Sequence, residues 1–80
     1  MSEKKQITLS DGRIAEVGEF KGRHVLEAQK VVGKETEKMI FALMAQCITI
    51  DGKKLVIEDY EDMPGPDVLS LMGEFGENFL

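Results

Sequence analysis

Few side chains in this 80-residue chain could carry out covalent chemistry. Cys47 is the one thiol and His24 the one side chain that titrates near neutral pH, so a catalytic site would have to begin with them. Cys47 falls on an apolar stripe, where a thiol behaves as a small buried hydrophobe, and His24 lies at an expected helix start. We therefore expect Cys47 to be buried, His24 to be exposed, and the protein not to be an enzyme.

Acidic residues form a second candidate site: Glu58, Asp59, Glu61 and Asp62. An EF-hand calcium loop beginning at Asp51 is excluded, because Lys53 and Leu55 occupy ligand positions and Val56 stands where glycine is required. No phosphate-binding glycine loop or Ser/His/Asp combination accompanies these acids. We expect a solvated acidic face or a docking patch for a basic partner, and no metal or other cofactor.

The composition limits the remaining classes of function. The net charge of -5 argues against nucleic acid or anionic lipid as a partner, because neutralising phosphates requires clustered cations. The longest apolar stretch, "MIFALMAQCITI", is too short to span a bilayer, and "MSEKKQ" precedes no apolar run. We expect a soluble, unexported, cytoplasmic protein that forms one domain over residues 1–80, with residues 1–5 disordered.

An Asp-Gly pair organises the first part of the chain. In "ITLSDGRIAEV", Asp11 and Gly12 supply the positive backbone angles of a tight turn between β-branched residues. A β-hairpin is therefore expected within residues 6–20. With Asp11 and Gly12 as its two loop residues, Leu9 would lie opposite Ile14.

Three helices are expected after this hairpin. A period of about 3.6 residues predicts the first over residues 22–32, the second over 35–48 and the third over 66–79. Between the second and third helices, Asp51-Gly52 predicts a turn. The expected fold class is α+β: an N-terminal β-hairpin, about three α-helices, and a short turn or hairpin between the second and third.

The expected second helix is apolar around about two-thirds of its circumference. Its apolar residues are Met39, Ile40, Phe41, Leu43, Met44, Ala45, Cys47 and Ile48. So wide a face must be covered on more than one side, by the rest of the fold or by a partner. An uncovered apolar groove typically receives a partner's amphipathic helix, and the same face could equally close a homo-oligomer.

Three segments, in this order, resemble the small tail assembly chaperones of Mu-like, long-tailed bacteriophages and prophages. They are "ITLSDGRIAEVGEFKGRHVLEAQ", "MIFALMAQCITIDGKKLVIEDY" and "DMPGPDVLSLMGEFGENF". The resemblance covers residues 6–80 and rests on the succession of hairpin, "KGR" helix start, "IDGK" turn and "DVLSLMGEF" helix.

This resemblance implies a non-catalytic protein of the bacterial cytoplasm that is absent from the mature virion. It would bind the tape-measure protein and keep it soluble until tail tube subunits assemble, with the tail tube protein as a second candidate partner. Combined with the wide apolar face, it gives these candidate partner-binding residues: Phe41, Leu43, Met44, Met72, Phe75 and Phe79.

Two other classes of function stay open. One is a minor structural protein of the virion tail or its connector, which would be present in purified particles. The other is an acidic inhibitor or adapter of a host protein that imitates nucleic acid. Its binding would weaken steeply with salt, because charge would supply the affinity.

Overall fold

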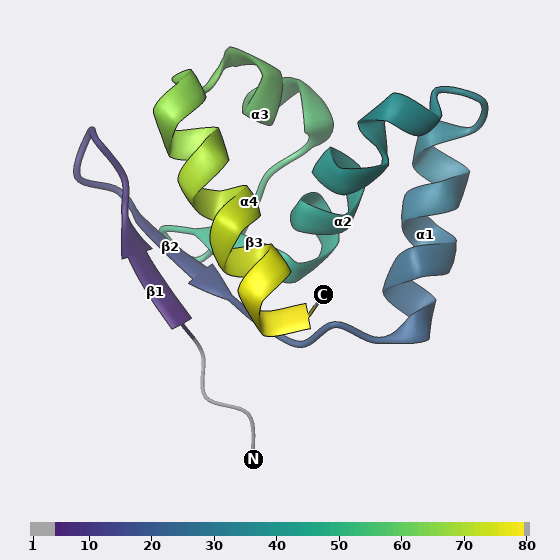
Figure 1. Ribbon diagram of the computed structural model, residues 1–80, viewed down its shortest axis with the longest axis horizontal. Helices are drawn as coiled ribbons and strands as arrows, with labels where there is room; N and C mark the ends of the chain where they lie inside the picture. The colour runs from purple at the N-terminus through teal and green to yellow at the C-terminus, as the bar shows by residue number, and fades with distance from the viewer. Residues whose placement is uncertain (1–4, 80) are drawn as a thin grey trace.

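The chain forms a small antiparallel sheet with helices packed over one face (Figure 1). The structure is a computed structural model that describes the backbone of residues 5–79 and the side chains of residues 5–77. In chain order the elements are β1 (Lys5–Thr8), β2 (Ile14–Val17), α1 (Gly22–Val32), the 3-10 helix η1 (Thr36–Lys38), α2 (Met39–Cys47), β3 (Ile48–Ile50), β4 (Lys53–Lys54), α3 (Ile57–Asp62) and α4 (Gly65–Phe79). The predicted α+β class, with an N-terminal hairpin followed by helices, is confirmed.

The first hairpin is present, but its register differs from the prediction by one residue. Ile14 pairs with Thr8 instead of Leu9. The Leu9 N–H donates to the Arg13 carbonyl over 2.8 Å, which leaves a three-residue loop that ends at Gly12. Only Gly12 has a positive φ in this loop, at 92°, whereas a two-residue loop of type I′ needs two such residues.

The second Asp-Gly pair forms the two-residue hairpin instead. Asp51 and Gly52 have φ angles of 52° and 81°, and Ile50 pairs with Lys53 across them. This hairpin joins the first one, because β3 pairs with β2 in a sheet of order β1-β2-β3-β4. The prediction that Ile48 belongs to a helix is wrong: Ile48 begins β3, where its β-branched side chain packs beneath the helices.

The helix boundaries agree well elsewhere. Helix α1 has the expected bounds, and Gly33 follows it with a φ of 55°. The expected second helix over 35–48 divides into η1 and the nine-residue α2. Of the segment 1–5 expected to be disordered, residues 1–4 lie outside the described residues and Lys5 opens β1.

The main core lies between the sheet and the helices α2 and α4. Ala15 and Ile48 from the strands meet Met44, Leu71 and Phe75 from the helices, and all five are fully buried. A smaller cluster joins α1 to α2 and α3 through Ala28, Val32, Ala42 and Ile57. Figure 1 shows the resulting order, with α4 across the sheet, α2 beside it and α1 outermost.

One polar contact links the first hairpin to the start of α4. Asp67 is 7% exposed, and its carboxylate accepts hydrogen bonds from the Ser10 N–H over 3.1 Å and the Ser10 hydroxyl over 2.7 Å. Because an acid also suits the first turn of a helix, this contact fixes the N-terminal end of α4 above the hairpin loop.

Candidate functional site

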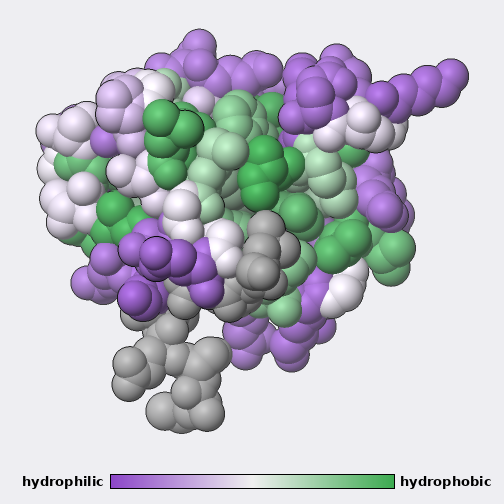
Figure 2. Space-filling model, viewed as in Figure 1, coloured by the Kyte–Doolittle hydropathy of each residue, from purple (hydrophilic) through white to green (hydrophobic). Residues whose placement is uncertain are grey.

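An open apolar groove of about 540 Å³ between α2, α3 and α4 is the strongest candidate for a binding site. Its apolar lining residues are Ile40, Phe41, Met63, Val68, Leu69 and Met72. We call the surface formed by these six residues the α2–α4 groove. Figure 2 shows apolar residues gathered over this part of the molecule.

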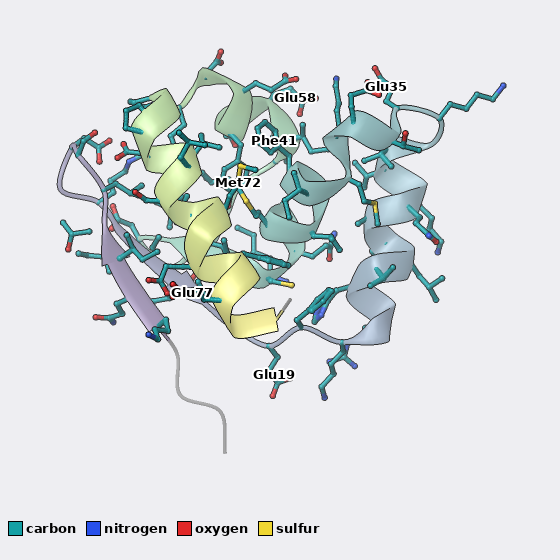
Figure 3. The ribbon with its side chains drawn as sticks, in the orientation of Figure 1. Glu19, Glu35, Phe41, Glu58, Met72 and Glu77 are labelled. Atoms are coloured by element: carbon teal, nitrogen blue, oxygen red, sulfur yellow. The ribbon has the colours of Figure 1, made fainter. Side chains whose placement is uncertain are left out.

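The groove follows from the width of the apolar face of α2. Met44 lies in the main core, and Ala42, on another side of α2, packs in the smaller cluster with residues of α1. Ile40 and Phe41 lie one turn before Met44 on the same side; they are half-buried, pack against the main core and also line the groove beside α4. Figure 3 shows Phe41 and Met72 in the space between these two helices. Both side chains are half-buried, which leaves apolar surface in contact with solvent.

The charged residues that line the α2–α4 groove are both acids, Glu37 and Glu61. Lys38 lies outside the lining, with its Nζ 3.5 Å from Glu61 Oε2 and 3.6 Å from Glu35 Oε1. These carboxylates, Glu35 first and then Glu61, raise the pKa of Lys38 above its usual value. Among the described residues, Glu37 makes no ion pair. The groove therefore presents an apolar floor with negative charge beside it.

A second, smaller groove of about 370 Å³ lies between α1, α2 and residues 54–58. We call it the α1 groove; its apolar lining includes Val31, Ala42, Ala45, Leu55, Val56 and Ile57. Its charged lining residues are two acids and two bases, Glu35, Glu58, Lys38 and Lys54. The α1 groove therefore has apolar surface without an excess of one charge.

Two of the predicted partner-binding residues line the α2–α4 groove, and three others, Leu43, Met44 and Phe75, do not. Phe41 and Met72 lie in it. Leu43 is half-buried, packs against both apolar clusters and is absent from the lining. The side chain of Phe79 lies outside the described residues.

Met44 and Phe75 require a correction. Both were expected on a partner-binding surface, but each is 0% exposed and belongs to the main core. Phe75 also packs edge-on against Phe20, with ring centroids 5.3 Å apart. A side chain with no exposed surface cannot contact a partner while the fold is intact, so these two residues support the groove from beneath.

Leu69 is the main binding candidate that sequence reasoning missed. It lines the α2–α4 groove and is 68% exposed, the largest exposure among the exposed large apolar side chains of the described residues. The sequence feature that could have identified Leu69 is its position on the helical projection of α4. It lies 100° from Val68, next to Met72, at the edge of the arc occupied by the apolar residues that pack in the core. An apolar residue on the shoulder of an otherwise complete apolar face indicates surface that extends beyond the core.

The predicted acidic patch is exposed on α3, and its members are Glu58, Asp59, Glu61 and Asp62. Part of its hydrogen-bonding capacity is used within the protein, because Asp59 accepts the Val56 N–H over 3.1 Å and so caps α3. Within residues 5–79, no three acidic, histidine or cysteine side chains are close enough together to hold a metal ion.

Cys47 lies in the interior of the fold, and His24 takes part in the start of α1. Cys47 is 4% exposed, and burial raises the pKa of its thiol to about 11, so at neutral pH it carries no thiolate. His24 was expected to be exposed but is half-buried, because its Nδ1 accepts the Lys21 N–H over 2.8 Å at the start of α1. Desolvation, and then the positive charges of Arg23 and Lys54, hold the pKa of His24 below its usual value.

This arrangement predicts that lowering the pH weakens the start of α1. The folded-state pKa of His24 lies below the unfolded value, so its contribution to stability is present above about pH 6.5 and declines as the pH falls through and below that value. Protonated Nδ1 cannot accept the Lys21 N–H. Urea unfolding at pH 7.5 and 5.5 should show a smaller loss of stability for His24→Gln, which keeps an acceptor but does not titrate, than for the wild type. Equal losses in the two proteins would contradict the assignment.

Comparisons with protein-family models, with curated proteins and with solved structures find no match to this chain. Among the described residues, no helix has both the length and the apolar composition needed to cross a lipid bilayer.

Proposed function

We propose that this protein is a non-catalytic phage tail assembly chaperone that binds the tape-measure protein and keeps it soluble until the tail tube assembles. The observation that carries the proposal is the uncovered α2–α4 groove. Leu69 is 68% exposed there, beside the half-buried Phe41 and Met72. Apolar grooves between helices are a common way to hold an amphipathic helix of a partner.

The charge of the protein supports this role. A chaperone that waits for a client must expose apolar surface without associating with itself, and a net charge of -5 provides mutual repulsion. Exposed ion pairs with a client would contribute about 0.2–1 kcal/mol each. Burying one leucine-sized side chain contributes about 1.5–3 kcal/mol, so apolar contacts in the groove would dominate the affinity.

The cellular setting follows from the proposed activity. The protein would act in the cytoplasm of the infected or lysogenic bacterium, before the tail is complete, and it would not remain in the virion. The resemblance to the small tail assembly chaperones supports this setting, and so does the acidic surface of α3, which suits a protein client better than nucleic acid.

Co-expression tests the proposal directly. The proposal predicts a neighbouring gene for a long, helical tape-measure protein. That protein should remain in the soluble fraction and co-purify when it is expressed together with this chain, and it should aggregate when it is expressed with an unrelated acidic protein of similar size. Soluble yield and co-purification are the measurements. Equal solubility with both partners would overturn the proposal, and detection of the protein in purified particles by mass spectrometry would favour a structural tail component instead.

A further inference from the structure

We propose that the α2–α4 groove binds a basic amphipathic helix of the client, with apolar side chains on the groove floor and Lys or Arg beside Glu37 and Glu61. The identity of the client as a tape-measure protein rests on the proposed function. The groove and the chemistry of its ligand follow from the charge, the walls and the length of the groove.

The two grooves differ in the charge of their lining residues. Both charged residues that line the α2–α4 groove are acids, whereas the α1 groove carries two acids and two bases. Glu37 makes no ion pair with any described residue, and Glu61 shares Lys38 with Glu35. The exposed Asp62 on α3 adds further negative charge nearby. A positively charged ligand is therefore favoured in the α2–α4 groove and not in the α1 groove.

The walls of the groove favour a ligand that is helical. The walls of the α2–α4 groove are residues of η1, α2, α3 and α4 together with Met63, so backbone groups of a sheet edge do not form them. An extended peptide could not extend a sheet there, so its N–H and C=O groups would depend on water for partners, and those that face the apolar floor would lose them. A helix satisfies its backbone internally and needs side-chain contacts alone.

The length of the groove fits about two turns of a ligand helix. The α4 wall of the groove runs from Gly65 to Met72. Seven helical steps between these residues cover about 10 Å, close to the length of two helical turns. Three apolar anchors spaced at i, i+3 or i+4, and i+7 would fill such a wall. Basic residues flanking the anchors would then lie beside Glu37 and Glu61.

Charge favours a client helix over a second copy of this chain as the occupant of the groove. In a two-fold dimer built on this groove, the same patch would contribute from both copies, so the interface would contain Glu37 and Glu61 of each copy and no basic residue from the groove lining. Each copy also carries a net charge of -5. Like charges brought together in this way disfavour association, whereas a basic helix removes the repulsion.

Matched pairs of variants test the inference, with wild-type tape-measure protein co-expressed as the client and its overlapping 25-residue peptides as probes of affinity. Leu69→Asp adds a charge to the α2–α4 groove, and Val56→Asp adds the same charge to the α1 groove at a position of similar exposure, 68% against 57%. The double variant Glu37→Lys and Glu61→Lys is matched by the double variant Glu35→Lys and Glu58→Lys, which reverses both acids that line the α1 groove and changes the net charge by the same amount.

We expect Leu69→Asp and the double reversal at Glu37 and Glu61 each to weaken binding of the best peptide by about tenfold or more. Val56→Asp and the double reversal at Glu35 and Glu58 should remain within about twofold of the wild type. Binding of that peptide should also weaken as salt is raised. Far-UV circular dichroism and the urea midpoint establish that each variant is folded, and a variant that is not folded is replaced by Leu69→Ser or Glu37→Gln.

Each other outcome has a defined meaning. If the wild type binds and the α1-groove variants are the weakened ones, or if all four variants bind normally, the inference is wrong and the proposed function stands. If the strongest peptides are acidic or bind as extended chains, the ligand chemistry is wrong. A wild-type dimer in sedimentation that Leu69→Asp dissociates would assign the groove to a second copy. If the wild type binds no client segment at all, the proposed function fails and the inference fails with it.

Discussion

Phe75→Ala is expected to leave most of the protein unfolded at room temperature. Phe75 has no exposed surface, lies in the main core and packs against Phe20 with ring centroids 5.3 Å apart. Truncating a buried phenylalanine costs about 3–5 kcal/mol, because burial is lost and a cavity remains. The core of a domain of this size rarely supplies a net stability above about 3–5 kcal/mol, so a loss of that size removes all or nearly all of it. Urea unfolding followed by far-UV circular dichroism measures the loss.

The matched control lies on the same helix. Leu69→Ala removes an apolar side chain that is 68% exposed, so the free energy of unfolding should change by less than about 0.5 kcal/mol. A similar urea midpoint for Phe75→Ala and the wild type would show that Phe75 is not a core residue. It would also restore Phe75 to the set of candidates for client contact.

The second large effect is expected at Asp67. Asp67→Ala removes the acceptor of two hydrogen bonds from Ser10, one of 2.7 Å and one of 3.1 Å, and removes an acid from the first turn of α4. A hydrogen bond to a charged group contributes about 1.5–3 kcal/mol, and the helix dipole adds about 0.3–1 kcal/mol. We expect a loss of about 2–3 kcal/mol in the free energy of unfolding, measured from urea titrations at constant pH.

A double-mutant cycle isolates the contact. Ser10→Ala removes the hydroxyl donor but keeps the Ser10 N–H, so it should cost less than Asp67→Ala. The double variant should lose less stability than the sum of the two single losses, because the residues act together. Strict additivity would mean that Asp67 stabilises α4 without help from Ser10. Loosening this contact should also weaken client binding, since α4 forms one wall of the α2–α4 groove.

The position of Ile48 shows why the periodicity of one segment does not determine where a helix ends. The segment "MIFALMAQCITI" reads as one apolar stretch, and helical spacing accommodates Ile48 as well as Cys47. The chain leaves the helix after Cys47 because Ile48 pairs with Val17 in β2, a residue far away in the sequence. Pairing between distant strands overrides a periodicity that is read along one segment.

The two Asp-Gly pairs show that a local pattern can predict a turn without predicting the length of its loop. Both turns were predictable, since Gly12 and Gly52 supply positive φ angles that other residues adopt with strain. Their loop lengths were not, because the Asp51 N–H donates to the Ile14 carbonyl over 2.8 Å and the Asp51 carboxylate accepts the Ile14 N–H over 3.0 Å. These contacts with the neighbouring strand help to hold Asp51 at its positive φ, and Asp11 has no positive φ.

The sequence by itself determined the fold class, the turns and the bounds of α1, because each depends on residues a few positions apart. It also indicated that α2 and α4 have apolar faces. Only the tertiary structure decided which residues on those faces are core: Phe75 is fully buried, while Met72, on the same apolar face of α4, is half-exposed in the groove. Helical periodicity fixes the direction of a side chain around its own axis. Whether that direction meets another element or solvent depends on where distant segments pack, and no local pattern contains that information.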